Sequence, residues 1–311
     1  MARTLLPILM AAAVAATVLT GCSASSATDG DELSIYATTG YLADVVKQVA
    51  PDADVETMVG PGGDPHTYQA STRDIQTILD ADLVLWNGLH LEAQMISQLE
   101  SLGDRQLAVA DQLPEDLLLG WPDTDDEGNP LHDPHVWNSP QAWSLVVGYV
   151  ADKLAQIDPD NAAQYQDNAA TFQQQIAAAD AAAAQLLAAV PEPRILITGH
   201  DAFNYFGATY DLDVYATDFV STEAILSAGK LSELAALIAA HEVPVIFRDN
   251  QANPQAITSL REAVLARGWD VAISDAELYA DSLGADDGVD TYLGVFTHNA
   301  HAIADALGSH T

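Results

Sequence analysis

Residues 158–190 read DPDNAAQYQDNAATFQQQIAAADAAAAQLLAAV, and after Pro159 no glycine or proline follows until Pro191. Asp158 is a suitable N-cap, Pro159 suits a first helical turn, and Pro191 ends the pattern. The larger apolar side chains recur at helical spacing with alanines between them; they are Tyr165, Phe172, Ile176, Leu186, Leu187 and Val190. The stretch therefore predicts one continuous helix of roughly 45 Å at about 1.5 Å per residue.

Short strands alternate with helices on both sides of this predicted helix. The strands are expected at 33–38, 55–59, 83–86 and 107–110 before it, and at 194–198, 214–216, 243–247 and 271–273 after it. This alternation favours an α/β fold with parallel sheets in both halves. We interpret 158–190 as a linking helix between an N-terminal lobe, 33–157, and a C-terminal lobe, 191–311. The alternative is a long surface helix of a single domain.

The N-terminus has the features of an exported protein. Arg3 precedes an apolar run at 5–18 that is too short to span a bilayer comfortably. The sequence Leu19-Thr20-Gly21-Cys22 follows and resembles a bacterial lipobox. We therefore expect a signal peptide over 1–21, a lipid on Cys22, a flexible tether over 22–32, and anchoring at the extracytoplasmic face of the cell membrane. An ordinary cleaved signal peptide with an incidental cysteine is the alternative.

Composition limits the chemistry that the chain can perform. Its 311 residues are 49% hydrophobic, enough for one large core or two smaller ones, and we expect two. With 10 basic and 45 acidic residues the net charge is −35, which repels nucleic acid and attracts cations. Cys22 is the only cysteine, so disulfides and thiolate metal sites are excluded. Histidine, aspartate and glutamate must supply any metal ligands.

Four loops beyond predicted strands each place a candidate metal ligand, namely His66, His135, His200 and Asp281. Ligands of open α/β sheets bind beyond the carboxyl ends of the strands, so loops from two facing sheets could converge there. A single histidine in a turn is more often a surface group, and Asp281 is the weakest candidate because aspartate is abundant here. The joint pattern points to a closed site of three imidazoles and one carboxylate.

The Asp-Pro-His triplets at 64–66 and 133–135 are suited to hold an imidazole at a fixed angle. Proline restricts its own backbone and that of the residue before it. Asp64, Asp133 or Asp201 could orient a neighbouring histidine through its second ring nitrogen.

Several short motifs stand in a particular order along the chain. They are GDPHTY at 63–68, NGLHLE at 87–92, DPHVW at 133–137, HDAF at 200–203 with Tyr205 and Phe206, and TYLG at 291–294 with His298 and Asn299. In this order they resemble the zinc/manganese substrate-binding lipoproteins of ABC importers, the solute-binding family of the ZnuA and TroA type (cluster A-I). The resemblance covers essentially the whole mature chain.

This resemblance implies two (β/α) lobes bridged by one long rigid helix, with a single metal ion in the cleft between them. The family's ligand positions match His66 and His135 in the N-terminal lobe and His200 and Asp281 in the C-terminal lobe. The resemblance thus selects Asp281, which the residues alone leave open. It further implies a receptor, monomeric and not an enzyme, that delivers a divalent ion to a cognate ABC permease and its ATPase.

The other histidines receive less specific interpretations. His90 lies within a motif typical of the family, and a supporting or packing role is expected for it. His132 directly follows the acidic loop at 122–131. It could pass a metal ion toward His135, although a solvated loop histidine is the simpler interpretation. We expect surface or tail positions for His241, His298, His301 and His310.

Zinc is the expected ion and manganese the alternative. Three imidazoles and a carboxylate suit Zn²⁺, which such sites bind far more tightly than Mn²⁺. Manganese receptors of one family branch carry glutamate at the position of His200. The chain lacks the long histidine-rich loop of many zinc receptors, and its motif at 87–92 resembles a branch of broader specificity. A zinc hydrolase and an adhesin are the remaining alternatives, and four protein ligands argue against the hydrolase.

Overall fold

The computed structural model describes residues 32–124, 128–217, 227–251 and 253–308. The predicted signal peptide, Cys22 and nearly all of the predicted tether lie outside these ranges. From Leu33 onward the described residues form one compact unit. No helix within the described ranges is both long and apolar enough to cross a membrane.

The N-terminal lobe is built on a four-stranded parallel sheet. Its strand order is β2-β1-β3-β4, with bounds β1 Ser34–Thr39, β2 Asp54–Val59, β3 Leu83–Trp86 and β4 Gln106–Ala108. The helices of this lobe are α1 Gly40–Val49, α2 Thr72–Asp80, α3 Ile96–Glu100 and α4 Pro140–Ile157. Ser71 and Asp74 form a capping box at the start of α2. Short 3₁₀ turns occupy Gly103–Arg105, Ala110–Gln112, Glu115–Leu117 and Val136–Asn138.

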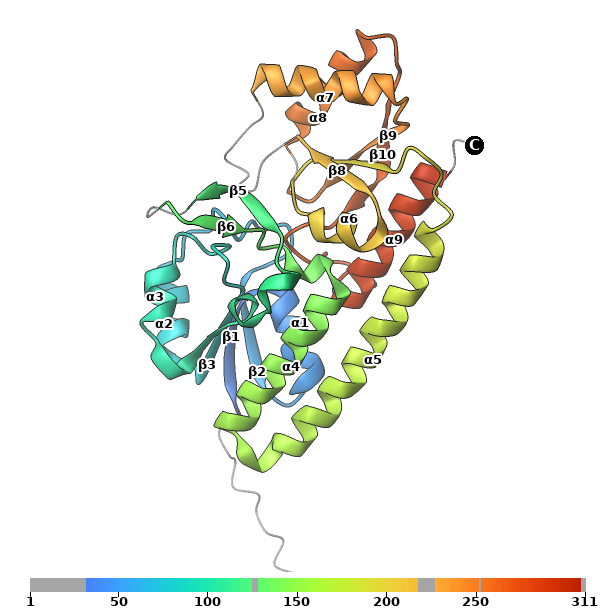
Figure 1. Ribbon diagram of the computed structural model, residues 1–311. Coiled ribbons are helices and arrows are strands. Elements are labelled where there is room, and N and C mark those ends of the chain that lie inside the picture. The colour runs from blue at the N-terminus through green and yellow to red at the C-terminus, as the bar shows by residue number, and fades with distance from the viewer. Residues whose placement is uncertain (1–31, 125–127, 218–226, 252, 309–311) are drawn as a thin grey trace, which may run out of the picture. The chain divides into compact units, whose positions relative to one another are not determined.

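The C-terminal lobe contains two parallel strand pairs. They join β7 Ile195–Thr198 to β8 Asp213–Ala216, and β9 Val245–Asp249 to β10 Ala272–Leu278. β7 also lies beside β9. The helices are α6 Asn204–Tyr210, α7 Ala228–Ala240, α8 Pro254–Leu265 and α9 Tyr292–Gly308. The predicted α/β class with parallel strands in both lobes is confirmed (Figure 1).

The linking helix is shorter than predicted. α5 spans Ala162–Leu187, and a 3₁₀ turn over Pro159–Asn161 precedes it. Asp158 ends α4 and accepts hydrogen bonds from Asn161 and Tyr165, so it stabilises the reversal between α4 and α5. At the other end, Arg194 donates to the carbonyl oxygens of Leu187 and Val190, which replaces a further helical turn.

α5 connects the two lobes by packing along both of them. It lies against α1 and α4 of the N-terminal lobe and against α9 of the C-terminal lobe (Figure 1). Its buried face is made by the predicted residues Tyr165, Phe172, Ile176 and Leu187, with Ala169 and Ala183 between them. The apolar periodicity therefore predicted the contact surface correctly, although not the first and last turns.

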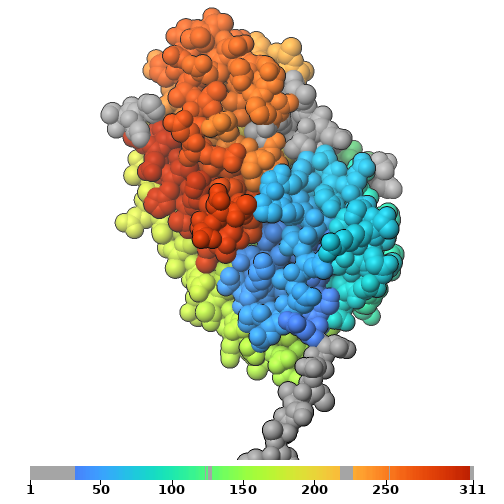
Figure 2. Space-filling view, turned by 180° about the vertical axis from the view of Figure 1, so that it is seen from behind, coloured from blue at the N-terminus to red at the C-terminus, as the bar shows by residue number. Residues whose placement is uncertain are grey.

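The largest hydrophobic cluster crosses from one lobe to the other. It includes Val45 of α1, Trp143 of α4, Phe206 of α6 and Phe296 of α9. Smaller clusters stay within one lobe: one surrounds Ile246 of β9 and another surrounds Trp86 of β3. Figure 2 shows the blue start of the N-terminal lobe directly beside the red segment that precedes and begins α9. The expectation of two separate cores was therefore wrong, because the linking helix and its neighbours share one.

A β-hairpin occupies much of the segment expected to be an acidic loop. Its strands are β5 Gly120–Thr124 and β6 Pro130–His132, paired antiparallel with Gly120 opposite His132. Trp121 supplies a buried apolar anchor on this hairpin. The hairpin lies next to the segment that carries His135 (Figure 1).

Candidate metal centre

His66 lies in a tight turn that begins where β2 ends. The N–H of Gly63 donates to the carbonyl oxygen of Gly60, and a Cβ at Gly63 would lie 2.6 Å from Cγ1 of Val59. A side chain at position 63 would crowd the Val59 side chain and the carbonyl oxygen of Gly60, so the turn favours glycine. Asp64 Oδ1 then accepts the backbone N–H of His66 at 2.9 Å. These contacts fix His66 relative to the sheet.

His135 lies in a second Asp-Pro-His turn with the same backbone bond. Oδ1 of Asp133 accepts the backbone N–H of His135 at 2.9 Å and lies 2.7 Å from its ring Nδ1. Since an ionised carboxylate only accepts, Nδ1 carries the proton and the lone pair resides on Nε2. Oδ2 of Asp133 accepts from Asn204 of the opposite lobe at 3.0 Å. Asp133 thus orients the ring of His135 and joins the lobes.

His200 follows β7 and is held by the strand next to it. Its backbone N–H donates to Oδ2 of Asp249, at the end of β9, over 2.8 Å. The hydroxyl of Thr198 donates to the carbonyl oxygen of His200, also at 2.8 Å. Both contacts act on the backbone, so they fix the position of His200 without engaging its ring.

Asp281 lies three residues beyond β10 in a segment held from both lobes. Asn250 accepts the N–H of Ala280 at 2.8 Å and donates to the carbonyl oxygen of Ser282 at 2.9 Å. The carbonyl oxygen of Ala280 accepts two hydrogen bonds of 2.9 Å from the N-terminal lobe, from Tyr41 Oη and Trp137 Nε1. The backbone that carries Asp281 is therefore fixed relative to both halves of the site.

These four segments bring the predicted ligand atoms together. Nε2 of His135 lies 3.2 Å from Nε2 of His66 and 3.3 Å from Nε2 of His200. The Asp281 carboxylate lies 3.5 Å from His66, 3.4 Å from His135 and 3.0 Å from His200. A tetrahedral Zn²⁺ ion with bonds of about 2.0–2.1 Å would separate its ligands by about 3.3–3.4 Å. The cluster has the dimensions of such a site.

Burial makes this arrangement costly without a cation. His135 and His200 are 0% exposed, Asp281 is 1% exposed and His66 is 7% exposed. Within the described ranges, the Asp281 carboxylate accepts no hydrogen bond from a backbone or hydroxyl group and faces only the three imidazoles, and Nδ1 of His200 has no hydrogen-bond partner. A buried carboxylate without such hydrogen bonds is strongly unfavourable unless positive charge lies beside it. The donor set, of three imidazoles and one carboxylate, fits a divalent ion such as Zn²⁺.

The electrostatics of the cluster show which member holds a proton when no ion is bound. Burial lowers the pKa of His200, but the charge of Asp281, its hydrogen bond to His200 and the charges of Asp249 and Asp201 together outweigh burial and raise that pKa to about 9. Burial lowers the pKa of His66 to about 3, only partly offset by Asp281. Although burial raises the pKa of Asp281, the charge of His200 and its hydrogen bond to the carboxylate hold that pKa well below its usual range. One proton on His200 therefore neutralises Asp281.

The structure brings together all four residues predicted as ligands. Of the three aspartates considered as orienting groups, Asp133 contacts a ring nitrogen, whereas Asp64 accepts the backbone N–H of His66 and Asp201 accepts from Asn204. Three of the predicted ligands follow parallel strands as expected, while His135 follows the antiparallel strand β6.

Sequence patterns did not reveal several residues that support the site. Tyr41, Trp137, Asn250 and Asp249 contact backbone beside Asp281 or His200 from distant parts of the chain. Within the described ranges, only the four predicted residues form a converging group of this kind, and His90 and His132 are not part of it.

The chain resembles known metal-binding proteins over almost its full length. A family model described as "Zinc-uptake complex component A periplasmic" (ZnuA) matches residues 35–306. The zinc-binding protein TroA of Treponema pallidum is 36% identical over 290 residues, which cover 92% of each chain. The manganese-binding lipoprotein MntA of Bacillus subtilis is 33% identical, with 96% of this chain and 98% of that protein covered. The solved structure of periplasmic TroA superimposes with a TM-score of 0.82 over 89% of this chain and 99% of that one.

Proposed function

Because this chain belongs to the zinc-uptake complex component A (ZnuA) family, we propose that it captures Zn²⁺ outside the cytoplasm and delivers it to an ABC permease. The protein is a substrate-binding receptor of a metal importer and not an enzyme. The permease and its ATPase are its partners, and the metal ion is its cargo.

One observation carries the proposal, namely the buried convergence of His66, His135, His200 and Asp281. We assign these four residues as the metal ligands. Four protein ligands complete a tetrahedron around zinc, whereas catalytic zinc keeps one position open for water or substrate. A site closed in this way suits retention and transfer of an ion.

Zinc is favoured over manganese by the chemistry of the donors. Three imidazole nitrogens bind Zn²⁺ far more tightly than Mn²⁺, which prefers oxygen ligands. The relatives support either ion, since TroA is named for zinc and MntA for manganese. Manganese is therefore the second candidate, and ion availability would decide between them in the cell.

The protein acts at an extracytoplasmic location. We assign lipid attachment to Cys22, which would become the first residue after removal of 1–21, with 22–32 as the tether. The assignment is supported by the Leu-Thr-Gly-Cys sequence after an apolar run and by the lipoprotein name of MntA. A monomer is expected, because both lobes of the site come from one chain.

Metal titration tests the proposed ligand set. Protein stripped with a chelator should bind one tight equivalent of Zn²⁺, and Zn²⁺ should displace Mn²⁺ in competition. His135→Ala should weaken this tight binding by more than about 100-fold, because removing a residue that only supports a metal ligand already lowers metal affinity about 10- to 100-fold. His241→Ala, at an exposed histidine beyond α7, is the matched control. Equal affinities in wild type and His135→Ala would contradict the assignment.

A further inference from the structure

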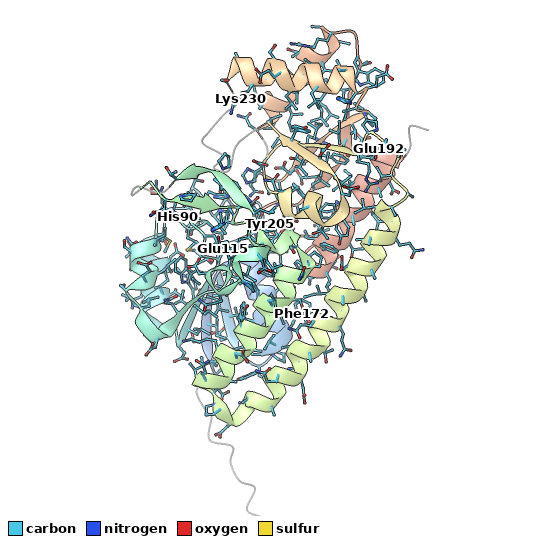
Figure 3. The ribbon with its side chains drawn as sticks, in the orientation of Figure 1. His90, Glu115, Phe172, Glu192, Tyr205 and Lys230 are labelled. Carbon is cyan, nitrogen blue, oxygen red and sulfur yellow. The ribbon has the colours of Figure 1, made fainter. Side chains whose placement is uncertain are left out.

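A second group of possible metal ligands lines a cavity beside the β5–β6 hairpin. The cavity has a volume of about 260 Å³, and its polar lining consists of His90, Glu100, Asp111 and His132. Trp86 and Leu131 contribute apolar walls. Figure 3 labels His90 and Glu115, which both lie on the hairpin side of the N-terminal lobe. None of these residues belongs to the four-ligand site.

His132 is paired with a carboxylate in the way that metal-binding histidines commonly are. Its Nε2 lies 3.4 Å from Oε1 of Glu115, while its Nδ1 is buried and has no hydrogen-bond partner within the described ranges. A proton on Nε2, directed at Glu115, would leave the Nδ1 lone pair available to an ion. Asp133 and His135 form the same kind of pair, with the two ring nitrogens exchanged.

The backbone that presents His90 is held in an uncommon conformation. Leu89 and His90 have φ values of +50° and +64°, in the left-handed region that residues other than glycine seldom adopt. Oδ1 of Asp111 accepts the N–H of Leu89 at 2.9 Å, and Asp111 also packs directly on Gly88. Such conformations persist where surrounding contacts enforce them, often at binding sites. Here they place His90 on the cavity wall.

The size of the cavity fits a hydrated cation. A volume of about 260 Å³ has room for an ion together with several of its water ligands. No three of these side chains bring ligand atoms within 4.8 Å of one another, in contrast to the four-ligand site. An ion bound here would therefore keep part of its water shell and take one or two imidazole nitrogens, with carboxylates acting directly or through water.

The hairpin separates this cavity from the four-ligand site. His132 faces the cavity from β6, and the next residue, Asp133, is completely buried and holds the ring of His135. From β5, the ring of Trp121 packs on that of His135, with centroids 5.7 Å apart. An ion held in the cavity would thus lie next to the element that covers the buried site.

From these contacts we propose that the cavity between His90 and His132 is a second, weaker binding site for a divalent transition-metal ion. Its ligands are His90 and His132, and Glu100, Asp111 and Glu115 supply negative charge. The strongly acidic character of the chain, with a net charge of −35, adds to the attraction for cations. The site is independent of the four ligands assigned above.

Equilibrium dialysis of chelator-stripped protein against Zn²⁺, with elemental analysis, tests this site. Wild type should bind two equivalents, the second more weakly. His90→Ala/His132→Ala should lose the second equivalent, with its affinity falling by more than about tenfold, and keep the first. His241→Ala/His301→Ala, which removes two exposed histidines elsewhere, is the matched control and should bind as wild type.

A variant of the buried site separates this proposal from the assigned function. His66→Ala/His200→Ala should lose the tight equivalent and retain the weak one. The second site is overturned if wild type binds a single equivalent, if the weak equivalent persists in His90→Ala/His132→Ala, or if the control loses it equally. If wild-type protein shows no tightly bound equivalent of Zn²⁺, the proposed function is overturned instead. Circular dichroism of each variant checks that it is folded.

Discussion

The hydroxyl of Tyr41 donates a 2.9 Å hydrogen bond to the carbonyl oxygen of Ala280, which lies 239 positions later in the chain. Trp137 Nε1 donates to the same oxygen, and the rings of Tyr41 and Trp137 stack with centroids 5.0 Å apart. Two N-terminal side chains therefore hold the C-terminal backbone immediately before Asp281. This contact sets the distance of Asp281 from His66 and His135.

Removing the Tyr41 hydroxyl should loosen this link. Tyr41→Phe loses one buried hydrogen bond worth about 0.5–1.5 kcal/mol, so Zn²⁺ affinity should fall about two- to tenfold. The loss is limited because Trp137 still satisfies the carbonyl group. Tyr36→Phe is the control, since Tyr36 donates to Asp74 away from the site. Equal zinc affinities for the two variants by calorimetry would show that the link does not position Asp281.

Asp133 should control the affinity of the site through the ring of His135. Asp133→Asn replaces the acceptor of the Nδ1 proton and should weaken Zn²⁺ binding by about 10- to 100-fold, as expected for a group that orients a metal ligand. Asp201→Asn is matched, because Asp201 also accepts from Asn204 but holds no ligand ring by a hydrogen bond. Fluorescence competition with a zinc chelator measures both. A similar loss in the two variants would argue against the orienting role.

Metal binding should release a proton near neutral pH. The pKa of His200 is raised to about 9 in the metal-free site, so this imidazole is protonated at pH 7 and must become neutral to bind Zn²⁺. Apparent affinity should therefore fall about tenfold for each unit that pH falls below about 9. Calorimetry at pH 7 in buffers of different ionisation enthalpy should report about one released proton. An affinity independent of pH between 7 and 8.5 would exclude this charge state.

The linking helix should permit only small movements of the lobes. α5 has no internal glycine or proline, and such helices are poor hinges. Small-angle scattering should give the same radius of gyration with and without Zn²⁺. Gln174→Gly/Gln175→Gly, at two exposed positions, should destabilise the helix by about 2 kcal/mol and weaken zinc binding.

The matched pair for this test is Gln174→Ala/Gln175→Ala, which keeps the helix intact. A radius of gyration that contracts by several ångströms on metal binding in wild type would contradict a rigid link.

Cys22 should determine where the protein is found in the cell. Cys22→Ala removes the only thiol and should move the protein from the membrane fraction to the soluble fraction or the medium. Ser23→Ala, at the neighbouring position, should leave it in the membrane fraction. Immunoblots of fractionated cells distinguish the two, and retention of Cys22→Ala in the membrane would refute lipid anchoring.

Local patterns in the sequence predicted much of the fold and the candidate ligands. Period and composition gave the buried face of α5, and the positions of His66 and His200 followed from where strands end, whereas the family resemblance selected Asp281. The start of α5 was missed because Asp158 is the C-cap of α4 and a 3₁₀ turn over Pro159–Asn161 separates it from α5. Whether Asp281 or another aspartate joins the site depends on the register of distant segments, which spacing does not encode.

Local sequence patterns did not predict the β5–β6 hairpin or the hydrogen bonds between the lobes, for a related reason. β5 and β6 are short, and the acidic residues at 123 and 125–127 give this part of the sequence the composition of a solvated loop. The packing of Trp121 on His135 marks the hairpin as structural. Tyr41, Asp249 and Asn250 act by donating to or accepting from backbone atoms far along the chain. Bonds of this kind leave no periodic signal in the sequence.

The hydrophobic cluster formed by α1, α4, α5, α6 and α9 makes the stability of both lobes depend on metal binding. Because the halves share this core, neither can open completely while the other stays intact. At a metal concentration 1,000 times the Kd, bound metal would stabilise the folded chain by about 4 kcal/mol. Proteases of the cell envelope, which cut chains that have opened, would therefore degrade the empty receptor faster than the loaded one. Metal supply would then set the lifetime of the receptor as well as its occupancy.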